Sequence, residues 1–182
     1  MDELPEKEIK SGLIELIKAG FLKNPELVEQ VYEADITKIN TELIKSAVDI
    51  KNEITKNDYK ETSERMFLNF GHTIGHLIEI DSQHTISHGE AVGIGILKAL
   101  KISEKITKLN PMITQNFENF LKKLELNTDY KFNSKPEQLE ELLFNDKKFS
   151  KGIVKYVLLK NVGEPLLVDF NLNDLLNEVT DG

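Results

Sequence analysis

Apolar residues recur at steps of three and four along most of this chain, and this helical spacing constrains the fold more than any other feature. The longest stripe, from Ile36 to Ile54, is sufficient for roughly six turns, and Asp35 is a suitable N-cap before it. Ser11 is the expected cap of an earlier helix. Shorter stripes predict further helices over residues 11–22, 25–34, 61–79, 89–105, 112–125 and 136–145.

The spacing changes near the C-terminal end. Residues 153–159 and 166–168 are β-prone and flank a turn-forming segment at 161–165, which predicts a short β-hairpin near 153–169. A final helix is expected over residues 173–179. Because strands and helices do not alternate, the predicted fold class is mainly α, with a single helical domain over residues 1–182.

Composition excludes several classes of protein. The 31 acidic and 23 basic residues give a net charge of −8, which argues against a nucleic-acid binder. Cysteine is absent, so any metal must be bound by His, Asp or Glu. The sequence has neither a membrane-spanning stretch nor an apolar leader, and a cytoplasmic protein without membrane partners is expected.

A line of polar residues marks the segment 61–79. Glu61, Arg65, Asn69, His72 and His76 are separated by four, four, three and four residues, so on a continuous helix they share one face. The rest of the segment is largely apolar. The line is therefore expected to be buried or to lie in a cleft.

Spacing alone leaves two metal schemes open. Either His72 and His76 share an ion, or His72 joins His88, at the start of the next helix, and a carboxylate from elsewhere. A metalloprotease site is excluded because residue 73 is threonine and not the glutamate that serves as its base. The alternative without chemistry is a set of hydrogen-bonded core histidines.

Three segments resemble the 3-dehydroquinate synthase family. They are SGLIELIK at residues 11–18, LNFGHTIGH at residues 68–76 and HGEAVGIG at residues 88–95. The resemblance implies the helical C-terminal domain of that type of enzyme. It also implies a metal site of Glu15, His72 and His88, which holds zinc or cobalt.

The resemblance further implies a pocket for an anionic sugar-phosphate substrate. Its expected ligands are Lys18, Lys51, Arg65, Asn69 and one or both of Lys147 and Lys148. Several cations suit a substrate that has both a phosphate and a carboxylate, and arginine can hold an oxyanion through two parallel hydrogen bonds. Glu61 and His76 are the implied catalytic proton acceptors.

The family reaction uses NAD as well as a metal. A substrate hydroxyl is oxidised, phosphate is eliminated, the carbonyl is reduced again, and the ring opens and recloses. Family members bind NAD mainly through an N-terminal α/β domain, and these 182 residues contain no strand–turn–helix cradle for it. That domain is an expected partner, and the chain alone is expected to be inactive.

Two other functions remain open at this point. One is a metal-dependent polyol or alcohol dehydrogenase, or a cyclase for another sugar phosphate. The other is a helical interaction module whose polar line forms an interface. A homodimer is compatible with each of these functions, since the sequence does not determine an oligomeric state.

Overall fold

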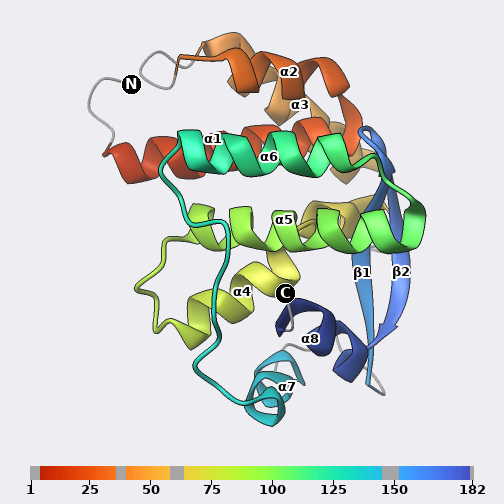
Figure 1. The fold of residues 1–182 in the computed structure, drawn as a ribbon. Helices are drawn as coiled ribbons and strands as arrows, with labels where there is room; N and C mark the ends of the chain where they lie inside the picture. The colour runs from red at the N-terminus through yellow and green to blue at the C-terminus, as the bar shows by residue number, and fades with distance from the viewer. Residues whose placement is uncertain (1–4, 36–39, 58–63, 145–151, 181–182) are drawn as a thin grey trace.

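Helix α5 (His88–Thr107) runs through the middle of the molecule, and other elements pack around it (Figure 1). Helices α1 (Glu6–Lys23) and α6 (Pro111–Lys123) lie along one side of it, and α4 (His72–Asp81) lies along the other. The computed structural model describes residues 5–35, 40–57, 64–144 and 152–180. Within these ranges the predicted mainly α fold is confirmed.

The remaining elements form two outer groups. Helices α2 (Pro25–Glu33) and α3 (Thr41–Asn57) cover α1 on the side away from α5. The 3₁₀ helix η1 (Glu64–Asn69) leads into α4. At the opposite end, α7 (Pro136–Phe144) packs against α8 (Leu172–Thr180).

The predicted hairpin is present and is antiparallel. Strand β1 (Ile153–Asn161) pairs with β2 (Glu164–Asn171), so that Val157 lies opposite Leu167. Gly163 in the turn has a φ of 82°, which glycine adopts readily. Its amide donates to the carbonyl of Phe21 over 2.8 Å and so ties the hairpin to the end of α1.

Three helix starts differ from or refine the predictions. Asn24 caps α2, because its side chain accepts a hydrogen bond from the amide of Leu27. Ser11 is not a cap, since α1 begins five residues earlier at Glu6. Asp35 is not the cap of α3 either: that helix begins at Thr41, behind an Asn40 side chain that accepts from the amide of Glu42.

The expected continuous helix over residues 61–79 is wrong, because the chain breaks at Gly71. Gly71 has a φ of 78° and separates η1 from α4. A Cβ on Gly71 would lie 2.4 Å from Cγ1 of Ile96, and one on Gly95 would lie 2.0 Å from the carbonyl oxygen of Gly71. The two glycines therefore let the start of α4 lie directly against α5.

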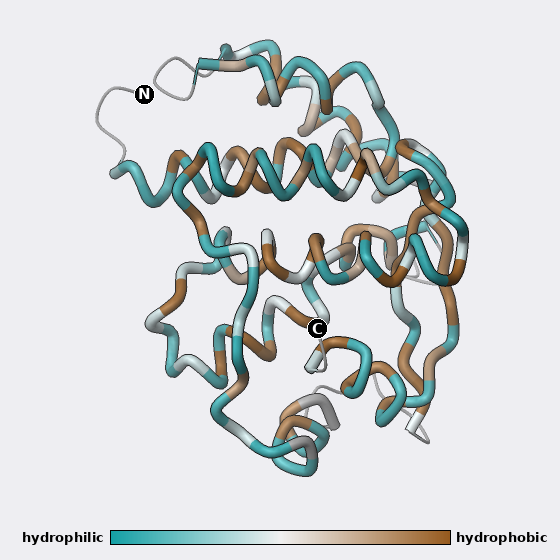
Figure 2. Tube along the Cα trace, viewed as in Figure 1, coloured by the Kyte–Doolittle hydropathy of each residue, from teal (hydrophilic) through white to brown (hydrophobic). Residues whose placement is uncertain are grey.

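The core contains an aromatic cluster at this break. Phe21 on α1 makes edge-to-face contacts with Phe70 and with Phe117 on α6, with ring centroids 6.1 and 5.4 Å apart. Figure 2 shows hydrophilic and hydrophobic residues alternating along α6, as an amphipathic helix requires, whereas the hairpin strands carry longer hydrophobic stretches. No described helix combines the length and the apolar composition needed to cross a membrane.

Candidate active site

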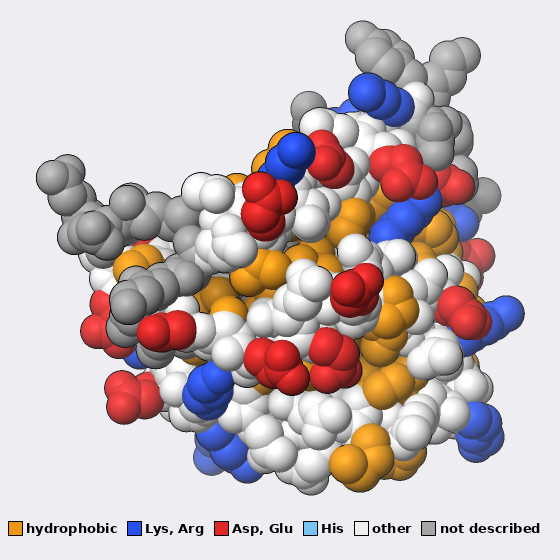
Figure 3. Space-filling view, turned by 90° about the horizontal axis from the view of Figure 1, so that it is seen from above, with side chains coloured by type: hydrophobic (Ala, Val, Ile, Leu, Met, Phe, Trp, Pro, Cys, Tyr) orange, Lys and Arg blue, Asp and Glu red, His pale blue; other side chains and the backbone are white. Residues whose placement is uncertain are grey.

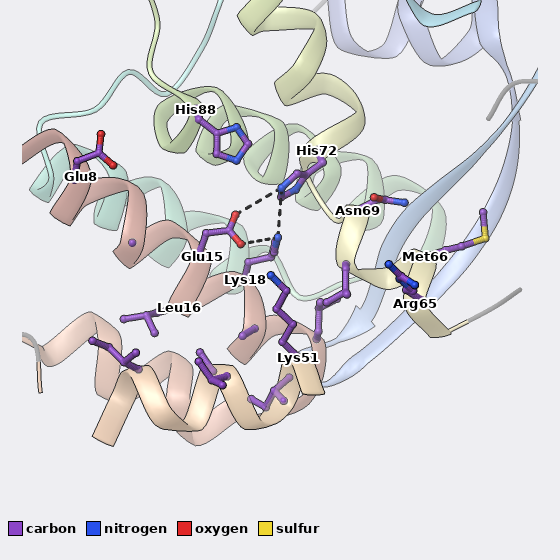
Figure 4. A pocket seen from close by; sticks show the side chains of 18 of the residues that line it. Glu8, Glu15, Leu16, Lys18, Lys51, Arg65, Met66, Asn69, His72 and His88 are labelled. Carbon is purple, nitrogen blue, oxygen red and sulfur yellow. Dashed lines mark hydrogen bonds and ion pairs between the residues drawn. The ribbon is translucent and has the colours of Figure 1, made fainter. Parts of the chain in front are cut away.

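A cavity of about 880 Å³ opens between α1, α3 and η1, beside the first residues of α4 and α5 (Figure 4). One part of its wall is apolar and comes from α1 and α3. The other part gathers most of the polar residues predicted from the sequence. These are Glu15, Lys18, Lys51, Arg65, Asn69, His72 and His88.

Three of these residues form a group that can hold a metal ion. Glu15 comes from α1, His72 is the first residue of α4, and His88 is the first residue of α5. One ligand atom from each lies within 4.8 Å of the others. A second group with the same property consists of His76, Glu79 and His88. The chain thus brings together the metal ligands implied by the family resemblance.

Glycines beside the histidines make this convergence of helices sterically feasible. A Cβ on Gly89, next to His88, would lie 2.3 Å from the Cα of Ser11, one helical turn before Glu15. The start of α5 therefore lies against the backbone of α1. In the same way, the close contact of Gly71 with α5 allows the start of α4, and with it His72, to lie against α5.

The break at Gly71 also orients His72. Nδ1 of His72 lies 3.3 Å from the carbonyl oxygen of Phe70, which can only accept, so Nδ1 donates. Nε2 then has a lone pair, and it lies 3.5 Å from Nζ of Lys18 and 3.6 Å from Oε1 of Glu15. Burial, together with the charge of Lys18, lowers the pKa of His72 to about 4. The imidazole is therefore neutral at physiological pH.

Lys18 and Glu15 form an ion pair in the same wall, with the lysine side chain buried and the glutamate side chain partly exposed. Lys18 is 6% exposed as a residue, and its Nζ lies 2.8 Å from Oε2 of Glu15. Burial lowers the pKa of Lys18, although Glu15 opposes this effect. Burial alone raises the pKa of Glu15, but Lys18 and the two imidazoles bring it below its ordinary value. Glu15 is therefore ionised.

A metal ion fits this arrangement. Oε1 of Glu15 is buried and has no hydrogen-bond partner among the described residues. It lies 3.6 Å from Nε2 of His72, a second acceptor, which is itself within hydrogen-bond distance of Nζ of Lys18. A carboxylate oxygen and two imidazole nitrogens are a donor set that zinc and similar divalent ions accept.

Further polar and cationic side chains line the same cavity. Lys51 extends from α3 toward Lys18, and Arg65 and Asn69 come from η1 (Figure 4). Arg65 is the single arginine of the chain. On the face seen in Figure 3, acidic and basic side chains are interspersed rather than gathered by sign. Within the cavity, Lys18, Lys51 and Arg65 lie in the same wall as the acids Glu8 and Glu15.

Some predicted residues lie elsewhere. His76 is exposed and is not part of the cavity wall, although its ring centroid lies 5.5 Å from that of His72 and 6.2 Å from that of His88. Glu61, Lys147 and Lys148 lie outside the described residues.

Two acidic residues near the site escaped the sequence analysis. Glu8 lines the cavity, and Glu79 contacts Nδ1 of His88. Helical spacing contained a signal for both. Glu79 follows His76 by three residues, and Glu8 precedes Glu15 by seven, which places each on the face of its known neighbour.

Solved structures share this fold over the whole chain. A 2-deoxy-scyllo-inosose synthase complexed with carbaglucose-6-phosphate, NAD⁺ and Co²⁺ matches 100% of the chain and 54% of its own, with a TM-score of 0.78 and 22% identity. The 2-epi-5-epi-valiolone synthase ValA of Streptomyces hygroscopicus subsp. jinggangensis 5008, with NAD⁺ and Zn²⁺ bound, matches 98% of the chain and 51% of its own, with a TM-score of 0.76 and 19% identity.

Curated relatives found by sequence have a higher sequence identity to this chain than these solved structures do. The 3-dehydroquinate synthase of Clostridium perfringens strain SM101 is 40% identical over 88% of this chain and 47% of its own length. That of Lysinibacillus sphaericus is 36% identical over 98% of this chain and 53% of its own. The chain thus spans about half the length of these curated relatives. The family model for the C-terminal part of 3-dehydroquinate synthase matches residues 12–149, and the chain therefore belongs to the 3-dehydroquinate synthase C-terminal family.

Proposed function

We propose that this chain is the metal- and substrate-binding half of a 3-dehydroquinate synthase of the shikimate pathway. The enzyme eliminates phosphate from a seven-carbon keto-acid sugar phosphate and closes the carbocycle of 3-dehydroquinate. The observation that carries the proposal is one cavity in which Glu15, His72 and His88 lie beside Lys18, Lys51 and Arg65.

Glu15, His72 and His88 would hold zinc or cobalt. When bound, such an ion supplies Lewis acidity, which lowers the pKa of a coordinated alcohol and polarises a ketone. The protein contributes a carboxylate kept ionised by Lys18 and a His72 imidazole kept neutral by burial. Both groups are thus in the protonation state that a metal ligand needs.

The cations of the cavity would bind the anionic ends of the substrate. Arg65 can hold an oxyanion through two parallel hydrogen bonds, and Lys51 adds a point charge. Asn69 supplies both a donor and an acceptor. Lys147 and Lys148 are proposed for the same anions. A neutral polyol has no use for so many cations, which favours a phosphate-eliminating enzyme over a polyol dehydrogenase.

Proton transfer is proposed for Glu61 and His76. The imidazole of His76 is exposed beside His88, where it can exchange a proton on a ring nitrogen with substrate or solvent. The chemistry that NAD supplies when bound is reversible hydride transfer, before and after phosphate elimination.

An N-terminal half is proposed as the partner that binds NAD. The described residues contain one antiparallel hairpin and no parallel strand pair of the kind that cradles a dinucleotide. Relatives that match over most of this chain are about twice its length. Without the nicotinamide held at near-attack distance, the chain alone should not turn over substrate.

The test is a fusion in which this chain replaces the matching half of the Clostridium perfringens relative. With the heptulosonate phosphate, NAD and zinc, the fusion should release phosphate and form a carbocyclic product, while the chain alone releases none. NADH should not accumulate, because the cofactor is regenerated in each turnover. A His72→Ala fusion is the matched control and should lose activity.

The outcomes separate the alternatives. Net NADH formation from a polyol, without phosphate release, would assign a dehydrogenase. Phosphate release from another sugar phosphate alone would assign a different cyclase. Micromolar NAD binding and turnover by the unfused chain would refute the two-half arrangement.

A further inference from the structure

We propose that Glu79 is a positioning residue that fixes the imidazole of His88 for metal binding. The inference rests on the proposed function, because it takes His88 as a metal ligand. In this arrangement a carboxylate on α4 sets which nitrogen of His88 faces the cavity.

The contact joins two helices across the turn between them. Nδ1 of His88 lies 3.2 Å from Oε1 and 3.1 Å from Oε2 of Glu79. The side chain of Glu79 is only 16% exposed, whereas that of His88 is 45% exposed. Among the described residues, His88 is the hydrogen-bond partner of this carboxylate. A largely covered acid thus restrains an imidazole that otherwise has room to change rotamer.

The direction of the hydrogen bond determines the tautomer. A carboxylate accepts hydrogen bonds, so Nδ1 of His88 donates, and the neutral ring keeps its lone pair on Nε2. His72 has the same arrangement, with the carbonyl of Phe70 as the acceptor. Both histidines therefore present Nε2 as the ligand atom, each held by an acceptor behind it. A carboxylate behind a ligating imidazole also increases its basicity.

The second group of potential ligands offers a competing role for Glu79. With His76 and His88 it could ligate an ion directly. Two observations favour positioning. Both carboxylate oxygens of Glu79 already lie on Nδ1 of His88, and the buried oxygen without a hydrogen-bond partner belongs to Glu15, in the other group.

The experiment compares Glu79→Ala and Glu79→Gln in the purified protein. Both variants remove the charge, but the glutamine oxygen can still accept from Nδ1. Zinc affinity, measured by competition with a chromophoric chelator, should fall about 10- to 100-fold in Glu79→Ala and by less than about 5-fold in Glu79→Gln. Glu104→Ala removes a carboxylate about 24 Å farther along α5 and should leave the affinity unchanged.

A spectroscopic measurement tests the orientation itself. Nitrogen-15 NMR of the metal-free protein, at a pH where the ring is neutral, should find His88 with its proton on Nδ1 in the parent and in Glu79→Gln. In Glu79→Ala, the form protonated on Nε2 should become substantial. A merely structural role for Glu79 would not change the tautomer of one ring.

Each outcome decides the inference. An affinity within twofold of the parent in Glu79→Ala, or an unchanged tautomer, would overturn it. Loss of zinc in Glu79→Ala and His76→Ala but not in His72→Ala would make Glu79 a ligand and overturn it as well. A parent without zinc affinity would refute the proposed metal site, and the tautomer comparison would still decide the role of Glu79.

Discussion

Nε2 of His72 lies 3.6 Å from Oε1 of Glu15, and both atoms are hydrogen-bond acceptors. Two buried acceptors this close together repel unless a cation lies near both. Nζ of Lys18 partly meets this need, at 2.8 Å from the other carboxylate oxygen and 3.5 Å from Nε2. The pair of acceptors formed by Glu15 and His72 is therefore suited to bind a cation.

The first prediction separates the two groups of potential ligands. His72→Ala should remove most of the bound zinc, because it deletes a buried nitrogen ligand, whereas His76→Ala should leave the metal content nearly unchanged. Elemental analysis of the purified variants measures this directly. Equal losses in both variants would favour the pair at positions i and i+4 and contradict the ligand set that includes Glu15.

The second prediction concerns the protonation of His72 in the metal-free protein. Burial and Lys18 hold the pKa of His72 near 4. Lys18→Met removes a repulsive charge and releases Glu15 from its ion pair, so the pKa of His72 should rise. Histidine NMR titration measures it. Lys45→Met, at an exposed position on α3, is the control and should leave the pKa of His72 unchanged.

The same shift makes the stability of the metal-free protein depend on pH. As pH falls from about 6.5 to about 4, the unfolded chain takes up a proton on His72 before the folded chain does. The free energy of unfolding should therefore fall across this window and depend less on pH in His72→Gln. Urea unfolding at pH 7 and pH 5 measures the difference. A His72→Gln variant with the full pH dependence of the parent would contradict the cause assigned here.

The sequence predicted the members of this site better than the backbone that holds them. The spacing predicts Arg65, Asn69, His72 and His76 on one face of one helix; the first three line one cavity, whereas His76 is exposed outside it. The helix itself is interrupted, because Gly71 takes a left-handed conformation against α5. Periodicity reports which side chains share a side of the chain, but it does not report a backbone contact with a distant glycine.

Contacts between different helices were the other feature that the sequence pattern could not predict. Glu79 meets His88 only because α4 and α5 lie side by side, and nothing in local spacing fixes that arrangement. Glu15 and His88 are likewise brought together by the fit of Gly89 against Ser11. For Glu15 the family resemblance supplied what the residue pattern alone could not.

The fourth prediction concerns Arg65, the single arginine of the chain. Arg65→Lys keeps the charge but loses one of two parallel hydrogen bonds to an oxyanion. In the fusion, kcat/KM for phosphate release should fall roughly a hundredfold, or on the order of 2–3 kcal/mol. The reverse exchange at an exposed position of α5, Lys101→Arg, controls for the substitution itself. If kcat/KM of the Arg65→Lys fusion stayed within twofold of the parent value, the proposal that Arg65 binds the substrate anion would be wrong.

The last prediction tests the close contact of α4 with α5. A Cβ on Gly95 would lie 2.0 Å from the carbonyl oxygen of Gly71 and 3.0 Å from the amide nitrogen of Gly75. These are backbone atoms, so Gly95→Ala can be accommodated only if α4 moves away from α5. We expect the free energy of unfolding to fall by about 3 kcal/mol or more, which thermal or urea denaturation measures.

Gly12→Ala is the matched control, because Gly12 lies inside α1 and a Cβ there has no neighbour within 4 Å. That exchange should stabilise the protein by up to about 1 kcal/mol through helix propensity alone. Gly95→Ala should also weaken zinc binding, since moving α4 carries His72 away from His88. A Gly95→Ala protein as stable as Gly12→Ala, with the zinc affinity of the parent, would mean that the contact between Gly71 and Gly95 does not determine where the two histidines lie.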